Sequence, residues 1–117
     1  MKVLSSLGNR NLSGKDKKLV RRKPYTQLAY PKYNRIKKKF PSLLIGFINN
    51  AENEVAKNPS IGTQKHGDLK GIYIYKFTPI DQELLLAYKV NNKKEKVIFI
   101  AIGGHENFYR DLKQYLK

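Results

Sequence analysis

Three strand-like runs in the second half of the chain constrain the fold most: residues 72–77, 84–90 and 97–102. Short connections separate them, one carrying Pro and Asp and the other carrying Asn-Asn and Lys. Connections this short join neighbouring strands as antiparallel hairpins. The third run is apolar on both faces, which is typical of a strand inside a sheet. We therefore expect a small, mainly antiparallel β-sheet.

The segment from Ser42 to Lys57 has the clearest helical pattern. Its apolar residues recur at i, i+3, i+4, i+7 and i+11, namely Leu44, Phe47, Ile48, Ala51 and Val55. That spacing predicts one apolar stripe on an amphipathic helix, and Asn58-Pro59 ends it. A shorter helix is expected from Pro31, with Tyr33, Ile36 and Phe40 on one face and Pro41 at its end.

The remaining segments complete an order of (β)ααβββα. Residues 25–30 fit a short edge strand, and residues 58–70 fit a polar loop. The helical spacing of residues 105–116 predicts a C-terminal helix with Phe108, Leu112, Tyr115 and Leu116 on its inner face. The predicted fold class is α+β, with a helical hairpin packed on the small sheet and a closing helix.

Positive charge is concentrated at the start of the chain. The chain has 24 Lys+Arg against 9 Asp+Glu, a net charge of +15, and residues 1–40 alone hold 13 basic residues and one acid. We predict a basic, flexible extension at 1–24 and a folded domain at 25–117. Such asymmetry favours nucleic-acid phosphates or an acidic protein as partner, with Lys37, Lys38 and Lys39 as contacts; a solvated lysine-rich surface is the alternative.

Several classes of protein are disfavoured. There is no cysteine, so disulfides and thiolate chemistry are excluded, and two histidines give no metal-ligand cluster. No glycine-rich phosphate loop is present, and we expect no small-molecule cofactor. No apolar run reaches the ~20 residues of a membrane span, and residues 1–14 lack the apolar core of a secretory signal. These features predict a cytoplasmic protein without a membrane partner.

The junction after the third strand run is the strongest candidate for chemistry. Gly103 and Gly104 lead into His105, followed by Tyr109 and Arg110. Cleavage of RNA by its 2′-hydroxyl needs a base, cations for the transition state and an acid for the 5′-oxygen. His105 would supply the base, Tyr109 a stacking ring or a proton, and Arg110 a phosphate clamp. Alternatively, His105 only caps a helix and Arg110 pairs with Glu106.

Other basic and aromatic residues extend this candidate site. Lys76 and Lys89 each interrupt an apolar strand. Both would grip RNA, with Lys89 as a fourth catalytic residue beside His105, Tyr109 and Arg110, or else they mark two solvated strand ends. The contacts predicted in the loop before the sheet are Lys65, His66 and Lys70, with His66 as a possible second acid or base. Phe108 would stack on a base or belong to the core.

The sequence of the second half resembles the RelE/ParE superfamily of bacterial type II toxins, most closely the RelE branch and its YafQ-like relatives. The resemblance covers residues 25–117 and is carried by residues 67–77, by residues 84–90, and most specifically by the His-Glu-Asn-Phe-Tyr-Arg sequence from 105 to 110. In YafQ-like toxins a histidine after a glycine, with an aromatic residue just behind it, assists catalysis; His105 and Phe108 match that pattern. Ala101 and Leu84 stand where those relatives have arginine and tryptophan.

The resemblance implies a toxin that cuts mRNA in the ribosomal A site and is neutralised by a cognate antitoxin. RelE itself uses lysines, arginines and a tyrosine, and the loose matches here are Lys65, Lys70, Lys76, Lys89, Arg110 and Tyr109. On this interpretation the partners are the antitoxin, mRNA and the ribosome. Two alternatives are a ParE-like inhibitor of DNA gyrase without catalytic residues, and a catalytically inactive RNA-binding relative.

Overall fold

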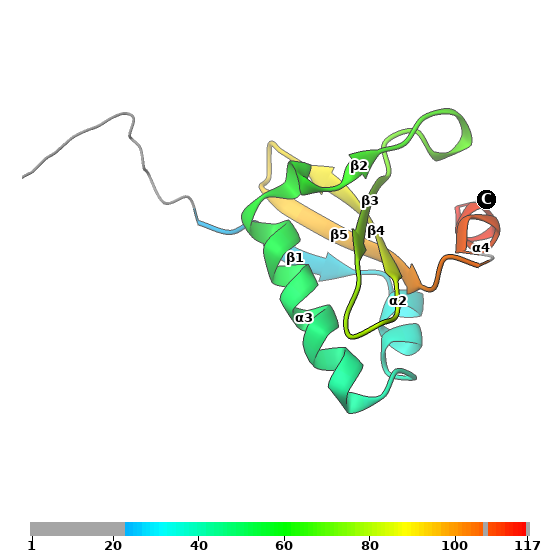
Figure 1. Cartoon of the computed structure of the whole chain (residues 1–117). Helices are drawn as coiled ribbons and strands as arrows, with labels where there is room; N and C mark the ends of the chain where they lie inside the picture. The colour runs from blue at the N-terminus through cyan, green and yellow to red at the C-terminus, as the bar shows by residue number, and fades with distance from the viewer. Residues whose placement is uncertain (1–22, 107, 117) are drawn as a thin grey trace, which may run out of the picture.

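A computed structural model describes residues 23–106 and 108–116, and its centre is a five-stranded sheet (Figure 1). The strand order is β1-β5-β4-β3-β2. The strands are β1 (Thr26–Ala29), β2 (Thr63–Gln64), β3 (Tyr73–Phe77), β4 (Leu84–Asn91) and β5 (Lys96–Gly103). Only β1 and β5 pair in parallel, and the other three pairs are antiparallel. The expected antiparallel hairpins and the edge strand near residue 25 are therefore confirmed.

Part of the predicted polar loop is structured. The loop holds two short 3-10 helices, η1 (Pro59–Ile61) and η2 (Gly67–Leu69), and between them β2 adds to the outer edge of β3. Two residues carry too little pattern to be recognised as a strand, so the sequence alone did not reveal this edge.

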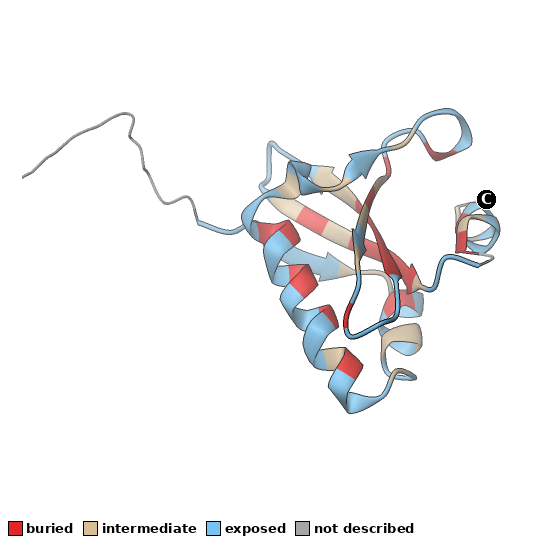
Figure 2. Ribbon diagram, viewed as in Figure 1, coloured by how far each residue is buried: buried red, intermediate tan, exposed pale blue. Residues whose placement is uncertain are grey.

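Two helices cover one face of the sheet, as the hairpin prediction required. They are α2 (Pro31–Lys37) and α3 (Ser42–Lys57). Buried positions recur along α3 (Figure 2), and the first core contains Tyr33, Ile48, Val55, Tyr88 and Phe99. The rings of Tyr33 and Phe99 stack at a centroid distance of 5.7 Å. This layer arises because the α3 stripe and the alternate residues of β4 and β5 bury apolar area together.

The opposite face of the sheet carries a second core under α4 (Phe108–Tyr115). Phe108 and Leu112 are buried there, together with Ile74, Leu85 and other apolar residues of the strands. The predicted helix began at His105, but the observed helix starts three residues later, after a turn. Because both faces are covered, β4 reads as an apolar run with five consecutive buried residues.

The apolar stripe of α3 differs from the prediction in two places. Phe47 is 38% exposed, because it lies on the flank of the stripe formed by Leu44, Ile48 and Val55. Glu52, an unexpected member, is only 8% exposed. Its carboxylate accepts a 2.6 Å hydrogen bond from the Tyr33 hydroxyl. Burial, with the nearby carboxylate as a second cause, raises the pKa of Tyr33 far above its usual range.

The predicted extension at 1–24 falls, except for Lys23 and Pro24, outside the described residues. Within the part of the chain that the structure describes, no helix is long and apolar enough to cross a bilayer.

Candidate functional site

A groove between the outer edge of β3 and α4 brings several predicted residues together. It encloses about 360 Å³ and is lined by Ile61, Thr63, Lys65, Ile74, Tyr75, Lys76 and Tyr109. We call it the β3–α4 groove. Two of its lining side chains are lysines, and the Lys76 side chain is 60% exposed. The groove therefore joins positive charge to two phenol rings, which suits a phosphate with an attached base.

Tyr109 is the centre of the site. The Nζ atom of Lys65 lies 5.2 Å from the centroid of its ring, a cation–π contact. On another side the imidazole of His105 meets the same ring edge-on at a centroid distance of 6.1 Å. His105, Lys65 and Tyr109 thus form one cluster, although His105 precedes α4 and is exposed. His105 and Tyr109 therefore lie together as predicted, although helix α4 begins at Phe108 and not at the histidine.

A buried hydroxyl fixes the segment that carries Lys65 to the groove. The Tyr88 hydroxyl donates to the Pro59 carbonyl at 2.7 Å and accepts from the Gly62 N–H at 2.9 Å. A Cβ atom on residue 62 would lie 2.6 Å from that hydroxyl oxygen, so only glycine fits. Burial raises the pKa of Tyr88 to about 12, while the Gly62 N–H acts in the opposite direction. The hydroxyl therefore stays protonated at neutral pH and holds η1 and β2 in place.

Register decides the positions of the two strand lysines. Lys76 is opposite Leu85, and Lys89 lies four residues further along β4, so both project from the α4 side of the sheet. Four strand residues span about 13 Å, so the two side chains start far apart. Lys89 instead approaches Tyr30, with Nζ 3.3 Å from the phenol oxygen. Lys76 lines the groove, and Lys89 does not.

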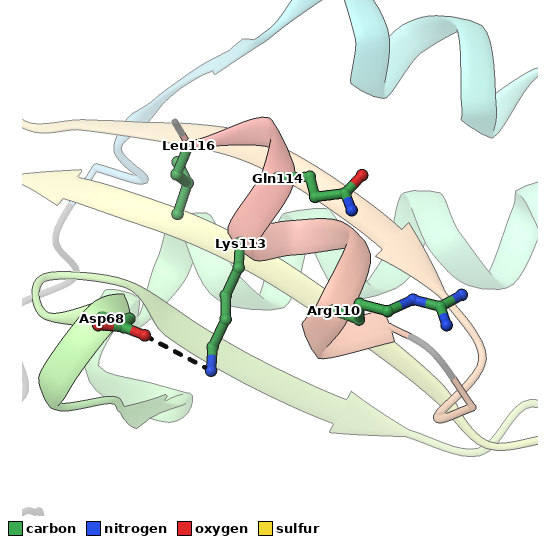
Figure 3. Close-up of a pocket in the computed structure, with 5 residues that line it drawn as sticks. All are labelled: Asp68, Arg110, Lys113, Gln114 and Leu116. Atoms are coloured by element: carbon green, nitrogen blue, oxygen red, sulfur yellow. Dashed lines mark ion pairs between the residues drawn. The ribbon is translucent and has the colours of Figure 1, made fainter.

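Arg110 lies beside a different hollow. A pocket of about 540 Å³ is lined by Asp68, Arg110, Lys113, Gln114 and Leu116 (Figure 3). Lys113 reaches Asp68 across it at 3.7 Å and so links α4 to η2. The guanidinium of Arg110 is 3.9 Å from Asp111, not from Glu106 as one interpretation proposed. Arg110 is absent from the lining of the β3–α4 groove, which separates it from Tyr109 and Lys76.

Two of the proposed RNA contacts have structural roles. Phe108 is 5% exposed and packs in the second core, so its ring is not available to a base and the core interpretation holds. Lys37 turns toward α3, where its Nζ lies 3.0 Å from Glu52 and 2.6 Å from the Asn49 side-chain oxygen. The Lys37 ammonium therefore balances the charge of the buried Glu52 carboxylate. The prediction that Lys37 contacts RNA from an exposed surface does not fit this position.

The other proposed contacts stay exposed. They are Lys38 and Lys39 after α2, and His66 and Lys70 on either side of η2. None of these four side chains lines the β3–α4 groove. Tyr75, in contrast, was not predicted to belong to the site and lines the groove at the free edge of β3. Tyr75 alternates with Lys76 along β3, and the edge is open at Tyr75 because β2 begins at Thr63, opposite Ile74.

The side chains of the groove support acid–base and electrostatic chemistry. Over residues 23–106 and 108–116 no group of three His, Asp or Glu side chains is placed to hold a metal ion. Lys65 and Lys76 supply positive charge, with Lys76 also 3.9 Å from the Glu83 carboxylate. Tyr109 in the groove and His105 beside it carry groups that transfer protons.

Known proteins give a consistent picture. The sequence matches a family described as the ParE-like toxin of type II bacterial toxin–antitoxin systems over residues 27–113. No curated protein matches the chain by sequence. Among solved structures, an arginine double mutant of Escherichia coli toxin RelE in the free state is similar, with a TM-score of 0.64 and 20% identity over 81% of this chain and 100% of that one.

A second similar structure is the Mycobacterium tuberculosis toxin–antitoxin complex RelBE2. Its TM-score is 0.63 at 15% identity, and the match covers 70% of this chain and 92% of that one. Identities this low establish the likeness of the folds, and the family match spans most of the sequence. The chain therefore belongs to the RelE/ParE superfamily of toxins from bacterial type II toxin–antitoxin systems.

Proposed function

We propose that this toxin is an endoribonuclease that cuts mRNA on the cytoplasmic ribosome, with the scissile phosphate held in the β3–α4 groove. The observation that carries the proposal is that Lys65, Lys76 and Tyr109 line one groove and that Lys65 and His105 both contact the Tyr109 ring. The two lysines would hold the phosphate, and the ring would pack against a neighbouring base.

The chemistry assigns each group a role. His105 accepts the proton of the 2′-hydroxyl as its oxygen attacks phosphorus. Lys65 and Lys76 stabilise the negative charge that develops on the phosphorane-like transition state. The Tyr109 hydroxyl donates its proton to the departing 5′-oxygen, which leaves a 2′,3′-cyclic phosphate. His105 does not line the groove either, but it contacts the Tyr109 ring and is therefore included; Lys89 and Arg110 take no part in this scheme.

A cognate antitoxin is the proposed protein partner. The similar structures include RelB–RelE complexes from E. coli and M. tuberculosis. A net charge of +15 favours an acidic antitoxin segment that covers the basic surface of the toxin.

The test is a reconstituted translation reaction with a defined mRNA, in which cuts are mapped by primer extension with and without ribosomes. We expect cuts only with ribosomes, and a loss of about 100-fold in cutting rate for His105→Ala and for Tyr109→Phe. The control variant is Arg35→Gln, which removes one charge from an exposed position of α2. Full activity of the double variant His105→Ala/Tyr109→Phe would overturn the site assignment.

The family description favours one alternative, a ParE-like inhibitor of DNA gyrase. Such an inhibitor binds a protein surface and needs no proton transfer, so it would tolerate both substitutions. Loss of gyrase supercoiling with intact mRNA, at equal concentrations of folded toxin, would establish this alternative and refute the nuclease.

A further inference from the structure

Three segments distant in sequence meet around Tyr25, at the end of the molecule where β1 begins (Figure 1). The Tyr25 N–H donates to the Ala56 carbonyl at the end of α3, at 2.8 Å. Its hydroxyl is 3.0 Å from the side-chain oxygen of Asn92, in the turn between β4 and β5. The Thr26 N–H donates to the Glu95 carbonyl of the same turn at 2.9 Å. These contacts hold the start of β1, the end of α3 and the β4–β5 turn as one unit.

The side chains gathered at this end are mainly lysines. We call the set Lys23, Lys57, Lys93, Lys94 and Lys96 the basic pole. The turn is well fixed: the Lys94 N–H donates to the Asn91 side chain at 3.0 Å, and Glu95 adopts a φ of 54°. Within the described ranges no carboxylate lies within ion-pair distance of the lysines of the turn, and Lys57 has only a 3.8 Å exposed pair with Glu54. Among the described residues, the ammonium groups of Lys93, Lys94 and Lys96 therefore have no ion-pair partner, although the exposed Glu95 belongs to the same turn.

The sequence that precedes Lys23 is also basic. Residues 1–22 lie outside the described residues, carry seven Lys/Arg and one Asp, and are joined to the pole through Lys23. The family match begins at residue 27, so this part of the chain is additional to the matched region. The pole lies where the start of β1, the end of α3 and the β4–β5 turn meet, and none of its five lysines lines the β3–α4 groove.

We propose that the basic pole is a second RNA-binding surface, which holds the phosphate backbone of a structured RNA without reading its sequence. Lysine ammonium groups act on phosphate as point charges. The ring of Tyr25 is partly buried and packs against the first core, so the exposed groups of the pole are mainly ammonium groups. Backbone contact without base contact gives affinity and orientation and no sequence preference. The proposal does not depend on cleavage in the groove.

The test measures binding of the full chain to a fluorescent RNA hairpin by anisotropy, between about 50 and 300 mM KCl. Methylation of every 2′-hydroxyl of the hairpin blocks cleavage, so a failure of the nuclease proposal would not affect the result. The test variant is Lys93→Gln/Lys94→Gln. The charge-matched control is Lys32→Gln/Arg35→Gln on α2, at the other end of β1.

Each phosphate contact contributes about 0.7–0.9 to the slope of log affinity against log salt. Losing two contacts should lower that slope by about 1.4–1.8 and weaken binding at about 0.15 M salt by roughly 15- to 30-fold. The control should retain the wild-type slope, and hairpins of unrelated sequence should bind equally. An unchanged slope in the test variant, or an equal loss in the control, would overturn the proposal. Tighter binding to phosphatidylglycerol vesicles than to RNA at the same salt would assign the pole to a membrane surface instead.

Discussion

The phenolic oxygen of Tyr88 makes a quantitative prediction possible, because Tyr88→Phe removes that oxygen and little else. The residue is 0% exposed, and its ring stacks on Tyr73 at 5.4 Å and meets Phe99 edge-on at 6.4 Å. Both ring contacts survive in phenylalanine. The variant loses the hydrogen bonds to Pro59 and Gly62, two residues in the segment leading to the groove.

Each hydrogen bond contributes about 0.5–1.5 kcal/mol, and its loss costs more where a partner is left buried without water. We therefore expect Tyr88→Phe to lower the free energy of unfolding at pH 7 by about 1–3 kcal/mol, measured in urea. Because η1 and β2 lose their anchor, Lys65 should also be positioned less well. The cutting rate of the folded variant should fall while His105 and Tyr109 stay in place.

The pH dependence follows from the pKa of Tyr88, about 12 in the folded protein against an ordinary value near 10. Above pH 10 the unfolded chain releases the phenol proton, but the folded chain keeps it until the pH approaches 12. Folding stability from this group is therefore complete below pH 10 and is lost between pH 10 and 12, by up to about 3 kcal/mol. The stability advantage of the wild type over Tyr88→Phe should shrink across that range.

Lysine deprotonation and the buried Tyr33 act on both proteins, so the difference between the two isolates Tyr88. A constant difference from pH 9 to 12 would show that the Tyr88 hydroxyl is not held protonated by burial. An equal stability of both proteins at pH 7 would refute the anchoring role itself.

Four further substitutions test the packing of the domain by thermal unfolding. Gly62→Ala places a Cβ atom 2.6 Å from the Tyr88 hydroxyl and should lower the free energy of unfolding by about 1–3 kcal/mol. Gly46→Ala, in open space within α3, should raise it by about 0.5–1 kcal/mol. A more stable Gly62→Ala than Gly46→Ala would contradict the close approach at residue 62. Phe108→Ala should cost about 3–5 kcal/mol and expose the amides of α4 to hydrogen exchange; unchanged protection there would argue against a core role. Glu52→Gln should cost about 1–3 kcal/mol because its ammonium partner stays half-buried, and a neutral effect would show that the pair contributes nothing.

The sequence predicted correctly those helices and strands that carry a regular apolar repeat of their own. Helix α3 has the predicted bounds of Ser42–Lys57, and all three strand runs lie within about one residue of the observed strands. In each case a regular apolar repeat reports directly which face is buried. The same reasoning placed Leu112 correctly in the second core.

The groove depends on contacts that no local pattern contains. Strand β2 is held by pairing with β3 and by a hydroxyl 26 residues away from Gly62. The separation of Lys76 from Lys89 follows from strand register, which the sequence left open. Glu52 is buried because Lys37 reaches it from another helix, and neither residue signals this pairing by spacing. Contacts between residues far apart in the sequence decide such positions, and these contacts leave no periodic pattern in the sequence.

Helix α4 couples the stability of the domain to the geometry of the groove. Phe108 points into the second core, while the next residue, Tyr109, lines the groove and contacts Lys65. The helix has only eight residues, so packing rather than intrinsic helix formation must hold it in place. Substitutions that loosen this packing should lower the cutting rate without removing any reacting group. Loss of activity in α4 is therefore evidence for a chemical role only where the variant keeps the wild-type protection of the helix, as Tyr109→Phe should and Phe108→Ala should not.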